Sequence, residues 1–217
     1  MTANRVSREL PSTVFQGLYL ILDEGWASRC LLGEVLRQAG EMGVKLVQYR
    51  NKTGSMKQAY EKARTLRQIA AEWAMMFVVN DRCDLALAVE ADGVHLGQTD
   101  LPLDLARRAV GNTMVIGVST HNPEQVRVAT ETGVDYLGFG PIFSTGTKLH
   151  HDPVVGVEGM VQVRPLTPLP IFAIGGITPD SVQELRQAGA NGVAVASGIL
   201  GAMDRPKAFQ QFMAPFP

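Results

Sequence analysis

Short apolar runs alternate along the chain with longer segments in which apolar residues recur every three or four positions. The short runs lack strict alternation of apolar and polar residues, which is typical of strands buried on both faces, as in a parallel sheet. Eight such runs are predicted as strands: residues 18–22, 44–49, 75–79, 93–96, 114–118, 134–139, 171–174 and 192–196.

The segments between these strands have the spacing and the end signals of helices. Val35, Leu36 and Ala39 are spaced as one helix face, and Ser55 is well placed to cap the next helix. The longest irregular piece is 144–158, in the stretch between the sixth and seventh strands, and a loop of that length in a compact domain suggests a functional element, here a candidate lid. Helices are predicted over residues 30–41, 55–73, 82–90, 102–110, 123–131 and 179–187, with a last one from about residue 206.

Eight strands that alternate with helices predict an α/β fold, a (β/α)8 TIM barrel. We expect one catalytic domain over residues 17–217, preceded by a polar N-terminal extension, residues 1–16. An open doubly wound sheet is also built from βα units and is the alternative. No G-x-G-x-x-G sequence follows the first predicted strand, which weakens a dinucleotide-binding version of that alternative.

The charge balance and the cysteine content limit the partners and the compartment of the protein. The formal net charge of −1 provides no overall basic field for nucleic acid, so any anion site must be local. No apolar run is long enough to span a bilayer, and the first 16 residues have no apolar signal-peptide region. Cys30 and Cys83 lack the spacing of a metal or redox pair, which suits a reducing compartment. We therefore expect a cytoplasmic protein that acts on small molecules and binds neither nucleic acid nor membranes, while the sequence leaves open whether it forms a homo-oligomer.

Charged residues collect after several predicted strands, where a barrel places its active site. Arg50 and Lys52 follow the second strand, and Lys148 follows the sixth. Asp81 and Asp100 follow the third and fourth strands, and a few carboxylates together with substrate phosphates usually hold Mg²⁺. The cations are also consistent with solvated surface charge, and each carboxylate with a helix start. Their occurrence together on one face favours a metal and a multiply charged anion between them.

A second group of small and hydroxyl-bearing residues favours a phosphate site. Gly175–Gly176 and Ser197–Gly198 follow the seventh and eighth strands, where barrels commonly bind phosphate through backbone N–H groups. Thr145 and Thr147 can serve the same phosphate from the loop after the sixth strand. Glycines in ordinary tight turns are the alternative. His95 lies inside the fourth strand, and we expect it to be a packed core or lining residue.

Several strings at the strand ends resemble the thiamine phosphate synthase family. Each string is moderately specific, whereas the whole set, in order at successive strand ends, is highly specific. The resemblance covers about residues 17–200, and Ala196 stands where family members usually have a larger Val or Ile. The strings are Gln48-Tyr49-Arg50-Asn51-Lys52, Val79-Asn80-Asp81, Asp92 to Asp100, Gly117-Val118-Ser119, Gly140 to Lys148 and Ala173-Ile174-Gly175-Gly176-Ile177.

The resemblance implies a transferase of thiamine biosynthesis. It would condense 4-amino-2-methyl-5-hydroxymethylpyrimidine pyrophosphate with 4-methyl-5-(2-phosphoethyl)thiazole, giving thiamine phosphate and pyrophosphate. The implied mechanism is a Mg²⁺-assisted dissociative substitution, in which a pyrimidine carbocation forms and the thiazole nitrogen attacks it. Little acid–base catalysis is then required of the protein, in keeping with the lack of a strong His or Glu constellation.

The resemblance also implies a role for each matching residue. Asp81 and Asp100 would carry the Mg²⁺ ion. The catalytic residues would be Arg50, Lys52, Ser119 and Lys148. The pyrimidine pyrophosphate would be bound by Gln48, Tyr49, Arg50, Asn51, Lys52, Asn80, Ser119 and Lys148. The thiazole phosphate would be bound by Thr145, Gly146, Thr147, Gly176, Ala196 and Ser197.

Two other functions are open to the same fold. A thiazole tautomerase would keep the phosphate pocket but would not need the pyrophosphate and metal set. The presence of Arg50, Lys52, Asp81, Asp100 and Lys148 together counts against it. A non-catalytic protein that binds thiazole phosphate is the second alternative, because fold alone does not decide function.

Overall fold

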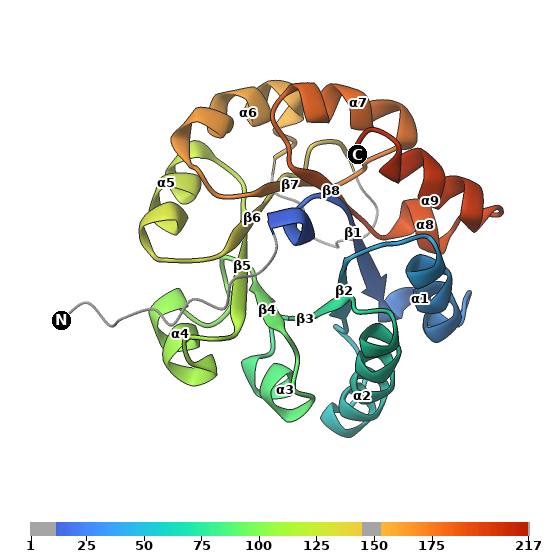
Figure 1. Ribbon diagram of the computed structural model, residues 1–217. Helices are drawn as coiled ribbons and strands as arrows, with labels where there is room; N and C mark the ends of the chain where they lie inside the picture. Colours follow the sequence, from blue (N-terminus) through green and yellow to red (C-terminus); the bar gives the residue numbers. More distant parts are fainter. Residues whose placement is uncertain (1–11, 145–152, 217) are drawn as a thin grey trace.

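A closed barrel of eight parallel strands forms the centre of the molecule (Figure 1), which confirms the predicted fold. The computed structural model describes residues 12–144 and 153–216. Every predicted strand is present, with ends that differ by up to two residues from the predicted ones. The strands are β1 (Gly17–Asp23), β2 (Leu46–Arg50), β3 (Met76–Asn80), β4 (Gly93–Leu96), β5 (Val115–Thr120), β6 (Tyr136–Phe139), β7 (Ile171–Ile174) and β8 (Gly192–Val195).

Helices surround the barrel (Figure 1), and each predicted helix is present. Two more were not predicted, α6 and the single-turn α8, and α6 shortens the expected irregular segment 144–158 because it begins at Gly156. Within the described ranges, none of the helices has the length and apolar character needed to cross a membrane. The helices are α1 (Leu32–Glu41), α2 (Met56–Glu72), α3 (Cys83–Ala88), α4 (Leu103–Val110), α5 (Pro123–Glu131), α6 (Gly156–Val163), α7 (Pro179–Gln187), α8 (Ser197–Leu200) and α9 (Arg205–Met213).

Local capping explains where several helices begin. The Ser55 side chain accepts a hydrogen bond from the backbone N–H of Gln58, and the Gln58 side chain accepts one from the Ser55 N–H. This reciprocal pair satisfies two N–H groups that the first turn of α2 would otherwise leave unpaired. Asn122 caps α5 in a similar way, and Pro123 occupies the first position, where its missing N–H costs nothing.

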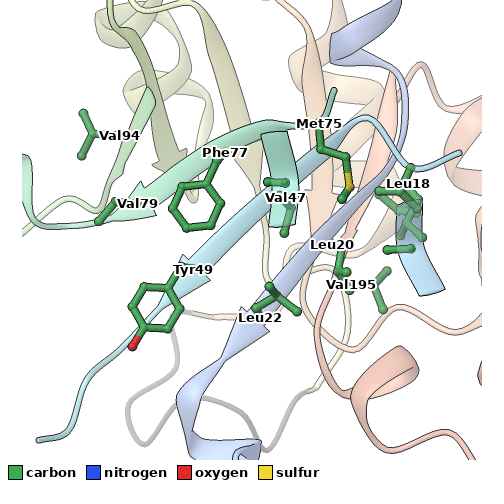
Figure 2. Close-up of a cluster of buried hydrophobic side chains, with 14 of the residues drawn as sticks. Leu18, Leu20, Leu22, Val47, Tyr49, Met75, Phe77, Val79, Val94 and Val195 are labelled. Atoms are coloured by element: carbon green, nitrogen blue, oxygen red, sulfur yellow. The ribbon is translucent and has the colours of Figure 1, made fainter. Parts of the chain in front are cut away.

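Alternate residues of each strand point outward into an apolar layer between the barrel and the helices (Figure 2). Leu20 of β1, Val47 of β2 and Phe77 of β3 lie in this layer and are fully buried. Burial of such a side chain contributes about 1.5–3 kcal/mol. The layer therefore fixes each helix to the strands it follows, and the strand-to-helix loops are held at one end of the barrel.

The remaining strand residues point inward and fill the barrel with a second, smaller cluster. Tyr19, Tyr136 and Phe172 meet edge to face, with ring centroids 5.2 to 5.8 Å apart. Phe15 belongs to the 3-10 turn η1 (Ser12–Phe15), is buried, and stacks on Tyr136 at 5.4 Å. The turn thus covers the amino-terminal end of the barrel (Figure 1). The domain boundary between residues 16 and 17 stays a prediction, and the residues just before it already contact the barrel.

Truncation of Phe15 should destabilise the barrel. Phe15→Ala removes the ring that covers Tyr136, and we expect the free energy of unfolding to fall by about 3 kcal/mol. Urea denaturation followed by circular dichroism measures the loss. Met203→Ala is the matched control because the Met203 side chain is fully exposed, and it should change stability by less than about 0.5 kcal/mol. Equal stability of the two variants would contradict a structural role for the turn.

Candidate active site

A salt bridge between the ends of β1 and β2 orients the first predicted cation. Arg50 ends β2 directly opposite Asp23, which ends β1, and the Arg50 guanidinium donates to the Asp23 carboxylate. The other Asp23 oxygen accepts the N–H of Gly25 at 2.8 Å. Asp23 is buried, and a charge-assisted bond of this kind holds an arginine in one geometry. Asp23 was not predicted as a site residue, although its place directly after an apolar run was the available signal.

The second cation contacts one of the two predicted metal carboxylates. Lys52 donates to Asp81, and the Asp100 carboxyl lies close enough to that of Asp81 to raise its pKa. Asp100 also accepts the N–H of Gly97 at 2.6 Å. Burial raises the pKa of the Asp81 carboxyl and contact with Asp100 raises it further, whereas Lys52 lowers it, and the net shift is upward. Two carboxylates in contact repel unless a proton or a cation lies between them, so this pair is suited to a divalent cation.

The backbone at Asp81 is strained. Its φ of 62° lies in the left-handed region, which residues other than glycine rarely adopt. The Asp81 N–H donates to the carbonyl of His95 at 2.8 Å, which holds the end of β3 against β4. Such strain costs about 1–3 kcal/mol and is concentrated at functional sites. Over residues 12–144 and 153–216 no three His, Cys, Asp or Glu side chains gather around one point, so a metal here would need further oxygen ligands from water or substrate.

A cavity of about 310 Å³ lies beside this charged pair. Its walls come from the loops after β2, β3 and β4, and Lys52, Asp81 and Asp100 are among its lining residues. Asn51 donates from its side chain to the Tyr49 hydroxyl at 3.0 Å. The Tyr49 ring is buried on the outer side of the barrel (Figure 2), where burial raises the pKa of its phenol. The loops after β2 and β3 therefore form one polar wall of the site.

Two further predicted residues point into the barrel. Gln48 of β2 and Ser119 of β5 are both buried, and β3 and β4 lie between their strands in the barrel. Side-chain hydrogen bonds connect them through three intermediates that were not predicted as site residues: Gln48 to Tyr19 at 2.7 Å, Tyr19 to Tyr136 at 2.7 Å, Tyr136 to His95 at 3.1 Å and His95 to Ser119 at 2.9 Å. His95 is a buried lining residue, as predicted, but its link to Ser119 was not foreseen. Asn80, also predicted, ends β3 opposite His95 in the strand register.

The predicted phosphate residues lie at the ends of β7 and β8. The loop after β6 is docked on the loop after β7, where the N–H of Phe143 donates to the carbonyl of Gly175 at 3.0 Å. Gly176 has a φ of 63°, and a Cβ there would lie 2.5 Å from the Ser144 carbonyl oxygen, so only glycine fits. Ala196 and Ser197 follow β8 at the start of α8.

Part of the predicted site lies outside the described residues. This holds for the candidate lid over most of its length and for four predicted substrate-binding residues, so their roles stay predictions. These residues are Thr145, Gly146, Thr147 and Lys148.

The chain matches known proteins over most of its length. Residues 18–199 match the family model described as thiamine monophosphate synthase. A thiamine-phosphate synthase of Pelotomaculum thermopropionicum is 47% identical over 171 residues, which cover 79% of this chain and 78% of that protein. Thiamine-phosphate synthase 1 of Aquifex aeolicus is 44% identical over 191 residues, covering 88% of each chain. The solved structure of thiamine phosphate pyrophosphorylase from Pyrococcus furiosus has a TM-score of 0.83 at 35% identity, covering 94% of this chain and 96% of that one.

Removal of one carboxylate should change the titration of the other. Asp100→Asn removes the negative charge beside Asp81, so we expect the pKa of Asp81 to fall in the metal-free protein while burial still keeps it raised. Titration of the ¹³C carboxyl resonance by NMR measures it. Asp84→Asn is the matched control, because Asp84 is exposed and pairs with Arg82 instead. An Asp81 pKa that is the same in both variants would show that the two carboxyls are not coupled.

Proposed function

This chain belongs to the thiamine monophosphate synthase family and is a transferase that makes thiamine phosphate, and we propose that it does so by Mg²⁺-assisted dissociative substitution. The bond between the pyrimidine methylene carbon and the pyrophosphate oxygen breaks, and its electron pair leaves on oxygen. The lone pair of the thiazole nitrogen then forms the new carbon–nitrogen bond. The carbocation charge becomes the thiazolium charge, so no proton has to move. The absence of a general base from the proposed residues is consistent with this chemistry.

The charged cluster at the ends of β1 to β4 carries the proposal. Arg50 and Lys52 are two residues apart, and each already contacts a carboxylate, Asp23 or Asp81. In the proposal both cations bind the pyrophosphate group and stabilise the negative charge that grows on it as it leaves. Arg50 keeps its contact with Asp23, which turns the remaining guanidinium N–H groups toward the substrate.

Asp81 and Asp100 are the proposed ligands of the metal. A bound Mg²⁺ ion supplies further positive charge to the leaving pyrophosphate. If the Asp81 carboxylate were to hold a metal ion, Lys52 would lose its partner, and its ammonium group would be available to a phosphate oxygen. The neighbouring carboxyl groups of Asp81 and Asp100 support this assignment because they concentrate acceptor oxygens in a partly buried place.

The other substrate binds at the ends of β6 to β8 in this proposal. The backbone at Gly176, Ala196 and Ser197 holds the thiazole phosphate, assisted by the loop residues Thr145, Gly146 and Thr147. Lys148 reaches the pyrophosphate from the same loop. Support comes from the close docking of the β6 and β7 loops and from the N–H groups at the start of α8, which have no partner within that helix.

The pyrimidine ring is placed between these two sites. Gln48 and Ser119 hold it from the barrel interior, and Asn80, Asn51 and the backbone at Tyr49 complete its surroundings. Close approach of the thiazole nitrogen to the reacting carbon supplies much of the rate enhancement, because the two substrates are held in one geometry. The small-molecule substrates fit the family. We place the reaction in the cytoplasm, in keeping with the free thiols of Cys30 and Cys83.

Pyrophosphate release should require both substrates and the metal. We expect a steady-state assay to show no release when the thiazole phosphate or Mg²⁺ is omitted, and Asp81→Ala should lower kcat at least about 100-fold. Asp84→Asn, an exposed carboxylate one helix turn away, should retain full activity. Full activity of Asp81→Ala would remove the metal assignment. Absence of release from the unmodified protein, despite tight binding of thiazole phosphate, would instead indicate a binding protein.

A further inference from the structure

A continuous chain of side-chain hydrogen bonds crosses the interior of the barrel. It runs from Gln48 through Tyr19, Tyr136 and His95 to Ser119, and it draws these residues from five different strands. Every member is at most 9% exposed. Burial of a polar group destabilises the fold unless the group is hydrogen-bonded. Apolar side chains would avoid this cost, so five buried polar side chains in one hydrogen-bond chain suggest a functional role.

Both ends of this hydrogen-bond chain lie at the level of the active site. In the strand register, Tyr19 lies opposite Leu46, and Gln48 is two residues nearer the carboxyl end of β2. Similarly, Tyr136 lies opposite Gly117, and Ser119 is two residues nearer the carboxyl end of β5. The two phenols therefore lie one level below the mouth of the barrel, and both ends of the chain rise to the level where the pyrimidine is proposed to bind.

The Tyr136 ring fills the space that a side chain at position 117 would otherwise occupy. A Cβ on Gly117 would lie 2.1 Å from Cζ and 2.5 Å from the hydroxyl oxygen of Tyr136. No alanine side chain fits in that space without moving the phenol. The φ of Gly117 is not positive, so its backbone conformation does not require glycine. Glycine is required at this position because the Tyr136 ring leaves no room for a Cβ atom.

The number of protons on the five side chains determines which group donates and which accepts in each hydrogen bond of this chain. The Gln48 amide donates to the Tyr19 hydroxyl, so the single Tyr19 proton is available for Tyr136. The Tyr136 proton then goes to Nδ1 of His95, and the proton on Nε2 of His95 goes to Ser119. With the Gln48 amide oriented as it is, the reverse direction would make the Tyr19 oxygen accept both bonds, and the buried Tyr19 proton would have no acceptor. Burial raises the pKa of both phenols, so both remain protonated donors.

The direction determines what each end presents to a ligand. With one N–H used by Tyr19, the Gln48 amide keeps its carbonyl oxygen and its second N–H. At the other end, Ser119 accepts from His95 and keeps its own proton to donate. The edge of a 4-aminopyrimidine carries an amino donor beside a ring-nitrogen acceptor, which matches the Gln48 amide. A 4-oxo ring carries an acceptor beside a ring N–H and mismatches the amide at both positions.

We propose that Tyr19, Tyr136 and His95 are positioning residues that lock the Gln48 amide and the Ser119 hydroxyl in one orientation and thereby select an amino- over an oxo-pyrimidine. The inference rests on the proposed function, in which Gln48 and Ser119 hold the pyrimidine. It assigns a role in substrate choice to three buried residues that need not touch the reacting atoms.

Tyr136→Phe tests the proposal because it removes only the hydroxyl and keeps the ring packing. Without the Tyr136 hydroxyl, the Tyr19 proton can be accepted within the hydrogen-bond chain only by the Gln48 carbonyl oxygen. We therefore expect the Gln48 amide to rotate so that its oxygen, rather than its nitrogen, faces Tyr19. We expect the ratio of kcat/KM for the amino- and 4-oxo-pyrimidine pyrophosphates to fall at least tenfold. Tyr60→Phe on α2, outside the barrel, is the matched control and should leave the ratio unchanged.

A second variant and a double variant complete the test. Tyr19→Phe removes the anchor of the amide and should lower the same ratio. The double variant should be no worse than the more severe single variant, because both changes act through one amide. Circular dichroism and thermal unfolding show whether each variant is folded. A folded Tyr136→Phe or Tyr19→Phe that keeps the ratio within twofold of the unmodified protein overturns the proposal. If the unmodified protein releases no pyrophosphate, the proposed function itself fails, which is a different outcome.

Discussion

Backbone hydrogen bonds between β1 and β8 close the sheet, and the position of each site residue depends on that closure. Gly17 lies opposite Gly192 at the join, where a Cβ on Gly192 would lie 2.2 Å from the Gly17 carbonyl oxygen. The absence of a side chain therefore lets the first and last strands approach. Once the barrel is closed, all strand carboxyl ends meet at one mouth, and residues far apart in the chain become neighbours.

The fold and much of the charged site followed from the sequence, because apolar runs report burial and the residues after them report one face. Arg50, Lys52, Asp81 and Asp100 were predicted in this way. The salt bridge between Asp23 and Arg50 was not, because it depends on the register between two strands, which the sequence pattern leaves undefined. The contact between Tyr19 and Tyr136 joins residues 117 positions apart, and no local spacing reports such a contact. Helix α6 was missed because its apolar residues lie close to a long irregular segment.

The site is organised as pairs of opposite charges that can exchange partners. Arg50 with Asp23 and Lys52 with Asp81 neutralise one another before any ligand arrives, so the mouth does not accumulate like charges. The two pairs differ in burial, since the Lys52 side chain is 51% exposed whereas that of Arg50 is 16% exposed. Arg50 is thus the more restrained of the two cations, and Lys52 is the more accessible to solvent.

The close fit between Gly117 and the Tyr136 ring also restricts how related sequences can diverge. A side chain at position 117 and a large ring at position 136 exclude one another, so the two positions can change only in a definite order. Tyr136 must be replaced by a smaller residue before Gly117 can be replaced by a larger one. The intermediate sequence then has a cavity in the barrel interior and lacks the hydrogen bonds of the Tyr136 hydroxyl. Such an intermediate loses both packing in the barrel interior and the hydrogen bonds that connect Gln48 with Ser119. We therefore expect Gly117 and Tyr136 to be retained together or replaced together in related sequences.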